Sequence, residues 1–255
     1  MADAVLFEAR ADGIAIITLN RPEVRNALGR EIREGLAAAW ARFEQDSALR
    51  VAILTGAGDK AFCAGGDLKE MVETGMAVPP RDFYALPYDT IELSKPTIAA
   101  VNGVAFAGGW MIAQACDLCV ASTTARFAIT EVKVGRGSPW ASPLIHMIPQ
   151  RIMMEIILTG KPITAQRAYE IGLVNRLAEP AALLEAALAL AAEIIDGAPL
   201  SVKAGRETVM LATEMGRAAA LQAARAAAET LYRSDDAQEG PRAFAEKRPP
   251  AWTGR

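Results

Sequence analysis

The sequence predicts an α/β fold, because short apolar runs of strand length alternate with segments of helical periodicity. Val51–Thr55 and Thr97–Val101 are compact apolar runs, which are typical of strands buried on both faces of a sheet. Arg30–Glu44 repeats its apolar residues at helical spacing. Strands that alternate with helices favour a layered structure with largely parallel pairing.

The remaining elements of the N-terminal part follow from the same patterns. Val5–Ala9 and Ile14–Leu19 flank a four-residue polar turn and predict a β-hairpin. A helix is expected over Trp110–Ala115, and a further buried strand over Leu118–Ala121. These elements extend the alternation of strands and helices along the chain.

The character of the sequence changes after Pro180. Ala181–Ile195 and Leu200–Leu231 are alanine-rich helical patterns with no strand between them. We therefore expect a core domain over residues 1–195 and a helical portion over residues 196–255.

Composition narrows the possible functions. The 255 residues include 27 Lys and Arg against 30 Asp and Glu, a net charge of −3 that predicts no broad basic face for nucleic acid. Cys116 and Cys119 have the spacing of a metal half-site, but no second pair completes it and His146 is the only histidine. We expect no metal. The few cysteines and the absence of a secretory pattern at Met1–Ala4 predict a cytoplasmic protein.

One stretch is long enough to cross a bilayer, because no charge occurs between Lys95 and Asp117. Pro96, Asn102 and several glycines interrupt it. These residues predict a strand, a turn and a helix in a buried core, and no membrane partner.

Two glycine clusters follow predicted strands. Gly65-Gly66 and Gly108-Gly109 place flexible backbone near the start of a helix, where free N–H groups attract negative charge. Each cluster taken alone is better explained by close packing of backbone on backbone.

Glu131 is the carboxylate with the most unusual surroundings. It lies in the apolar stretch Phe127–Val132, where burial would raise its pKa and suit it to proton transfer. A carboxylate paired with Lys133 or Arg136 is the alternative. The spacing alone leaves both interpretations open.

Together these segments resemble the crotonase superfamily, also called the enoyl-CoA hydratase/isomerase family. The resemblance covers nearly the whole chain and rests on ordered motifs: Leu19-Asn20-Arg21-Pro22 with Asn26-Ala27-Leu28, residues 60–68, residues 95–103, Ala107-Gly108-Gly109, Cys116-Asp117, Gly172-Leu173-Val174-Asn175 and residues 244–249. It implies a spiral of repeated β-β-α turns with C-terminal helices that build a homotrimer or a hexamer of two trimers. It also implies an acyl-CoA substrate and no permanently bound cofactor, with coenzyme A present as part of the substrate.

The resemblance also implies roles for particular residues. The backbone N–H groups of Gly66 and Gly108 would form an oxyanion hole for an enolate, and Glu131 matches a family glutamate that transfers a proton. Phe244 and Lys247 match positions near the adenine of coenzyme A. The other candidate substrate-binding residues are Lys60, Ala64, Asp67, Leu68, Trp110, Met111, Pro139 and Trp140.

The chain departs from the family's hydratases at two points. Met111 stands where they carry the first of two glutamates, and methionine can neither transfer a proton nor orient a water. Pro139 stands where a backbone donor helps to hold that water, and proline has no N–H. Trp110, Met111 and Trp140 predict an apolar, partly filled pocket.

These departures predict an enzyme in which Glu131 is the single acid/base and the reaction is double-bond isomerisation or weak hydration of an enoyl-CoA. One alternative is a specialised reaction on the same fold, such as decarboxylation, dehydration or carbon–carbon cleavage of an unusual acyl-CoA. Another is a non-catalytic, RNA-associated member of the family, which the acidic composition disfavours.

Overall fold

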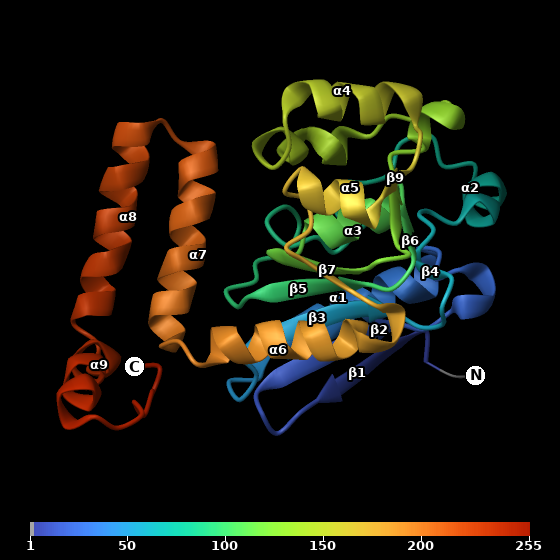
Figure 1. Cartoon of the computed structure of the whole chain (residues 1–255). Helices are drawn as coiled ribbons and strands as arrows, with labels where there is room; N and C mark the ends of the chain where they lie inside the picture. The colour runs from blue at the N-terminus through green and yellow to red at the C-terminus, as the bar shows by residue number, and fades with distance from the viewer. Residues whose placement is uncertain (1–2) are drawn as a thin grey trace. The chain divides into compact units, whose positions relative to one another are not determined.

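The computed structural model describes residues 3–255, and its strands form two sheets (Figure 1). Residues 1 and 2, which open the Met1–Ala4 stretch considered above, lie outside the described residues. The six-stranded sheet has the order β1 (Val5–Ala9), β2 (Ile14–Leu19), β3 (Val51–Gly56), β5 (Thr97–Val101), β7 (Leu118–Ser122) and β10 (Arg176–Ala178). The four-stranded sheet has the order β4 (Ala61–Cys63), β6 (Val104–Phe106), β8 (Arg126–Ala128) and β9 (Ile163–Thr164).

Successive strand pairs alternate between the two sheets. β3 and β4, β5 and β6, and β7 and β8 each contribute one strand to either sheet, and helices α2 (Leu68–Thr74) and α3 (Gly108–Gln114) follow β4 and β6. The neighbours β2–β3, β3–β5 and β5–β7 pair in parallel. This is the repeated β-β-α arrangement that the family resemblance implies, and the α/β fold class is confirmed.

The N-terminal elements also match their predictions. β1 and β2 form an antiparallel hairpin in which Val5 lies opposite Leu19. Helix α1 (Arg30–Gln45) buries a stripe of apolar residues: Ile32, Leu36, Ala39, Trp40 and Phe43. The stripe exists because these positions recur at the helical period, and it packs into the hydrophobic core.

The uncharged stretch between Lys95 and Asp117 is divided into β5, β6 and α3, as predicted. Among the described residues, no helix combines the length and the apolar character needed to cross a membrane. The rest of the core carries α4 (Gln150–Thr159), α5 (Ala165–Glu170) and 3-10 helices at Pro22–Val24, Glu131–Lys133, Pro139–His146 and Pro180–Ala182.

The chain forms two compact units, one of residues up to 93 with 97–191, the other of residues 94–96 with 192–255. The second unit holds the end of α6 (Leu183–Ile195), then α7 (Pro199–Glu214), α8 (Arg217–Tyr232) and α9 (Asp235–Glu246). α7 and α8 pack against each other (Figure 1). The expected division into domains at residue 195 stays a prediction.

The single helical pattern expected over Leu200–Leu231 is wrong in one respect. Met215 adopts extended backbone, with φ −120° and ψ 154°, and Gly216 is the N-cap residue of α8. Glycine is a poor helix former because it loses the most backbone entropy, so the chain turns there and begins a second helix.

Asn26 ties the hairpin's exit to the loop between β3 and β4. Its side chain is fully buried: Oδ1 accepts a hydrogen bond from Arg21 N at 2.9 Å, and Nδ2 donates to Ala57 O at 3.0 Å and to Ala61 O at 2.9 Å. Its φ of 54° lies in the left-handed region, which asparagine tolerates better than most residues. One side chain therefore satisfies three backbone groups from segments far apart in sequence.

We expect Asn26→Ala to lower the free energy of unfolding by about 2–4 kcal/mol, because it leaves buried backbone groups unpaired and places alanine at a positive φ. Asn26→Gly tolerates the positive φ but also lacks the amide, so its loss should be smaller. Urea denaturation of both variants checks this. Equal and negligible losses would show that the three hydrogen bonds do not hold the loop.

Candidate active site

The two glycine clusters lie against each other. A Cβ atom placed on Gly108 would lie 3.6 Å from the backbone nitrogen of Gly66. At Gly65, φ is 103° and a Cβ would come within 2.9 Å of Phe106 O. Close backbone packing, the simpler explanation of each cluster, is therefore also what brings the Gly66 and Gly108 amides together.

Helix α3 begins at this contact and is fixed there by a second close approach. A Cβ on Gly109 would lie 2.0 Å from Cys63 O, so no side chain fits between α3 and β4. The preceding residue, Ala107, has φ 49° and ψ −121°, a conformation that costs a non-glycine residue about 1–3 kcal/mol. Its N–H donates to Ala128 O at 2.8 Å, which helps to hold the turn that sets the direction of the Gly108 amide.

Glu131 follows β8 directly and opens a short 3-10 helix. Its Oε1 accepts a hydrogen bond from Trp140 Nε1 at 2.8 Å. Its Oε2 is buried and has no hydrogen-bond partner within residues 3–255. Burial raises the pKa of Glu131, and the bond from Trp140 acts in the opposite direction. One oxygen is therefore anchored while the other is available to a proton.

The alternative pairing of Glu131 with a neighbouring cation does not occur in the described part of the chain. Lys133 is exposed, and the Arg136 guanidinium donates instead to Met76 O and Ala77 O, each at 3.1 Å. Of the two interpretations that the sequence left open, the structure supports the buried carboxylate without a cationic partner.

Trp140 makes a contact with Glu131 that the sequence did not predict. It lies in the 3-10 helix Pro139–His146, whose first residue, Pro139, is exposed. Gln114 Nε2 donates to Trp140 O at 2.5 Å and so links this segment to the end of α3. The spacing predicts an apolar residue near the pocket, but not that its indole N–H points at Glu131.

Trp110 and Met111 are buried in the hydrophobic core, with exposed fractions of 1% and 4%. The Trp110 ring packs edge-on against Phe127, with ring centroids 5.7 Å apart. Among the described residues the indole Nε1 of Trp110 has no partner. Both side chains lie on the buried side of α3, and neither supplies a carboxylate.

The other candidate substrate-binding residues lie in two places. Lys60, Ala64 and Leu68 surround the Gly66 loop, with Lys60 and Leu68 exposed. Asp67 caps α2, because its carboxylate accepts hydrogen bonds from Lys69 N at 3.0 Å and Glu70 N at 3.3 Å. Their contacts with a substrate stay predictions.

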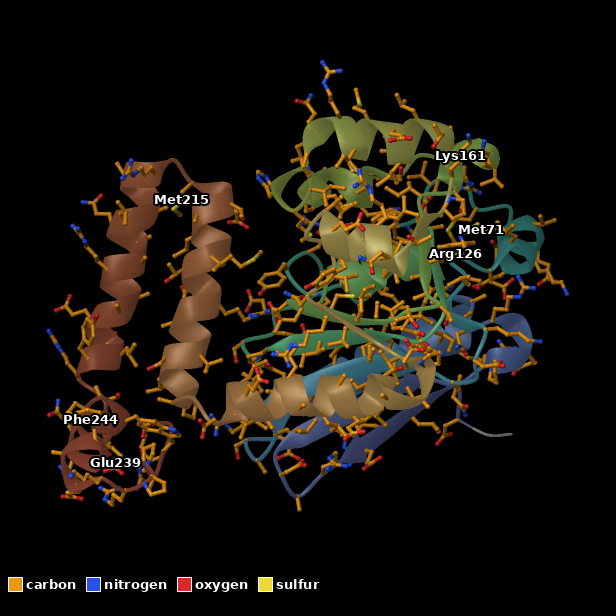
Figure 2. The ribbon with its side chains drawn as sticks, in the orientation of Figure 1. Met71, Arg126, Lys161, Met215, Glu239 and Phe244 are labelled. Carbon is orange, nitrogen blue, oxygen red and sulfur yellow. The ribbon has the colours of Figure 1, made fainter. Side chains whose placement is uncertain are left out.

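Phe244 and Lys247 belong to the second compact unit. Phe244 is 87% exposed on α9 (Figure 2), and Lys247 ends that helix at a φ of 55°. Their place beside coenzyme A likewise stays a prediction.

Sequence reasoning missed Tyr84. Its hydroxyl lies 3.6 Å from the position that a Cβ on Gly66 would take. The segment between α2 and β5 has no regular apolar pattern, and a single tyrosine within it gives no signal. Met71 of α2, labelled in Figure 2, was missed for a similar reason, although its Cε lies 2.5 Å from that same Cβ position.

Within residues 3–255 no group of three or more His, Cys, Asp and Glu residues lies together as a metal site would require. Cys63, Cys116 and Cys119 are buried and form no disulfide among the described residues. Burial raises the pKa of the Cys63 and Cys119 thiols to about 12. Cys116 and Cys119 thus serve as small apolar side chains of the core.

We expect iodoacetamide at about pH 8 to leave all three thiols of the folded protein unmodified, because all three are buried and burial also raises the pKa of Cys63 and Cys119. Mass spectrometry before and after unfolding in guanidinium chloride checks this. Rapid modification of the folded protein would mean that a thiol is accessible and acidic.

Trp140→Phe removes the indole donor to Glu131 and keeps an aromatic ring, so the pKa of Glu131 should rise above its wild-type value. The ¹³C shift of the Glu131 carboxyl, assigned by its absence in Glu131→Gln, measures this directly. An unchanged or lower pKa would show that the hydrogen bond does not form in solution.

Comparisons with known proteins agree with this geometry. The Enoyl-CoA hydratase/isomerase family matches residues 9–255. The chain is 40% identical over 251 residues to (E)-benzylidenesuccinyl-CoA hydratase of Thauera aromatica, covering 94% of this chain and 96% of that protein. It is 39% identical over 260 residues to carnitinyl-CoA dehydratase of Salmonella typhi, covering 98% of both chains.

Among solved structures, it is similar to an enoyl-CoA hydratase from Mycobacterium tuberculosis H37Rv, with a TM-score of 0.92 and 42% identity over 99% of this chain and 100% of that one. The similarity extends along nearly the whole chain. The chain belongs to the enoyl-CoA hydratase/isomerase family, within the crotonase superfamily.

Proposed function

We propose that this protein adds water to, or removes it from, an acyl-CoA thioester at the α,β position, with Glu131 as its only carboxylic acid/base. The observation that carries the proposal is the buried, unpartnered Oε2 of Glu131, in the same compact unit as the adjacent Gly66 and Gly108 amides. An anchored carboxylate with one free oxygen is suited to moving a proton without leaving the site.

The two amides would hold the thioester oxygen while negative charge develops on it. Each preorganised donor of this kind lowers the barrier by about 2.7–4 kcal/mol. Because this stabilisation comes from backbone N–H groups, it depends on the close packing at Gly65 and Gly109 and not on any side chain.

One carboxylate is sufficient for a balanced reaction. Glu131 Oε2 takes a proton from water as the water oxygen bonds to Cβ, and the enolate then receives that proton at Cα. In the reverse direction Glu131 removes the Cα proton and delivers it to the departing hydroxyl. The carboxylate is regenerated in both directions, so a second glutamate at position 111 is not required by the proton balance.

The relatives support the choice of hydration and dehydration. The two curated proteins described above carry the names of a hydratase and a dehydratase. Double-bond isomerisation is the second candidate, and the observation that favours it is Met111, which leaves α3 without a carboxylate to orient water. In that reaction Glu131 would move a proton from Cα to Cγ.

The helices of the second unit support a further part of the proposal, that three copies assemble and that two such trimers can pair. These helices expose large apolar side chains that a neighbouring subunit could cover: Val209, Met215, Leu221, Tyr232 and Phe244. In this arrangement Phe244 and Lys247 contact the adenine end of coenzyme A.

The cytoplasm remains the predicted location of the protein.

Mass spectrometry in D₂O with crotonyl-CoA and 3-hexenoyl-CoA tests the function. We expect the wild-type protein to add water and deuterium to crotonyl-CoA, and Glu131→Gln to lose about 10²–10⁴-fold in rate with little change in thioester affinity. The rate should also fall as the pH drops through the raised pKa of Glu131, because the base must be ionised to accept a proton.

Glu185→Gln is the matched control, since this glutamate is exposed on α6 and should leave the rate unchanged. An undiminished rate in Glu131→Gln would remove Glu131 from the mechanism. Double-bond movement without water addition would select the isomerase candidate.

A further inference from the structure

The segment between α2 and β5 holds a second hydrogen-bonding group beside the amide pair. Tyr84 Oη lies 3.6 Å from the Cβ position of Gly66, and Gly66 N is itself next to Gly108. The backbone of Tyr84 is fixed by Thr90, whose Oγ1 donates to Tyr84 O at 2.6 Å and accepts from Leu86 N at 2.8 Å. The hydroxyl is therefore held close to the predicted oxyanion hole.

The ring of Tyr84 is braced from α1 and α2. It packs edge-on against Phe83 with centroids 4.9 Å apart, and the Arg33 guanidinium lies 3.9 Å from the centre of the Phe83 ring. Arg33 in turn forms an ion pair with Glu70, with Nη2 and Oε1 2.8 Å apart. These contacts hold Tyr84 in place through Phe83, Arg33 and Glu70, although it lies in an irregular segment.

The Tyr84 hydroxyl is neutral and has no hydrogen-bond partner among the described residues, although the side chain is largely buried and packs on the core. Burial raises the pKa of Tyr84, Arg33 opposes this, and nearby Cys63, Glu70 and Glu131 raise it further. The phenol therefore keeps its proton at physiological pH and offers one donor and two acceptor lone pairs.

The hydroxyl lies next to Gly66, and Glu131 is among the charged groups close enough to raise the pKa of Tyr84. A thioester whose oxygen lies on the two amides and whose Cα faces Glu131 places Cβ in this region. The oxygen added to or lost from Cβ needs a hydrogen-bonding group there, and Met111 has none.

We propose that the Tyr84 hydroxyl directly binds the oxygen on Cβ, both as the incoming water and as the hydroxyl of the product. This inference rests on the proposed function and assigns the polar contact that α3 lacks. Tyr84 donates a hydrogen bond and transfers no net proton, because Glu131 Oε2 takes the water proton and returns it to Cα. The substrates that it favours are therefore acyl-CoA thioesters with an oxygen at Cβ.

Calorimetric binding in the Glu131→Gln background, which is expected to dehydrate 3-hydroxybutyryl-CoA only slowly, isolates this contact. Butyryl-CoA lacks the Cβ oxygen and 3-hydroxybutyryl-CoA carries it, and each enantiomer of the latter is titrated separately. The proteins are full-length Glu131→Gln, its double variant with Tyr84→Phe, which removes only the hydroxyl oxygen, and its double variant with Tyr169→Phe, which removes an exposed hydroxyl on α5 as a control.

We expect Tyr84→Phe to weaken one enantiomer of 3-hydroxybutyryl-CoA by about three- to tenfold, the effect of one neutral hydrogen bond, and to leave butyryl-CoA unchanged. Tyr169→Phe should change neither. Equal weakening of both thioesters would mean that Tyr84 only shapes the pocket, and would overturn the proposal. So would an unchanged affinity for both.

A second experiment tests the proposed function separately by measuring the Glu131-dependent uptake of deuterium at Cα of butyryl-CoA in D₂O. Tyr84→Phe should retain this exchange, because no oxygen is added at Cβ. Absence of exchange in the wild type would reject the role of Glu131, while the binding comparison would still decide that of Tyr84.

Discussion

The structure depends on a contact between two loops that has no room for side chains. Parallel pairing of β4 with β6 brings the ends of both strands to the same edge of the smaller sheet, where the loops at Gly65 and Gly109 pack backbone against backbone. Asn26 and the backbone around it hold the first loop, with Ala64 N bonded to Arg25 O and Leu28 N to Gly65 O. The neighbouring amides of Gly66 and Gly108 are a consequence of this packing.

The same core creates an electrostatic cost at Glu131. An apolar environment disfavours the ionised carboxylate, and hydrogen bonds from the backbone of Glu131 and from the Trp140 indole offset only part of this. Because the folded-state pKa lies above the unfolded value, the folded protein binds more protons in the interval between them. The contribution of Glu131 to stability is therefore lost as the pH rises through that interval. The fold therefore tolerates a destabilising residue at the position proposed for proton transfer.

Much of the fold was predictable because its information is local. β5 spans the predicted residues Thr97–Val101, and the hairpin and α1 follow from apolar periodicity alone. Glu131 was found for the same reason, since an acid within an apolar run is visible in the sequence. The break at Gly216, the Trp140 indole bond and Tyr84 were not predictable. Glycine favours a break, but Gly205 lies inside α7 without interrupting it, so the residue type alone does not locate the break at Gly216. The other two depend on side-chain directions across segments far apart in the chain.

The groups beside Gly66 come from two kinds of segment, and this matters for how related proteins can differ. The amide pair belongs to loops locked by sheet pairing, whereas Tyr84 and Met71 reach the same place from α2 and the residues after it. Substitutions in residues 71–93 change the shape and polarity offered to an acyl group without altering the geometry of the amides. Under the proposed function, a change of substrate would therefore need substitutions in this segment alone, while the amide pair keeps its place.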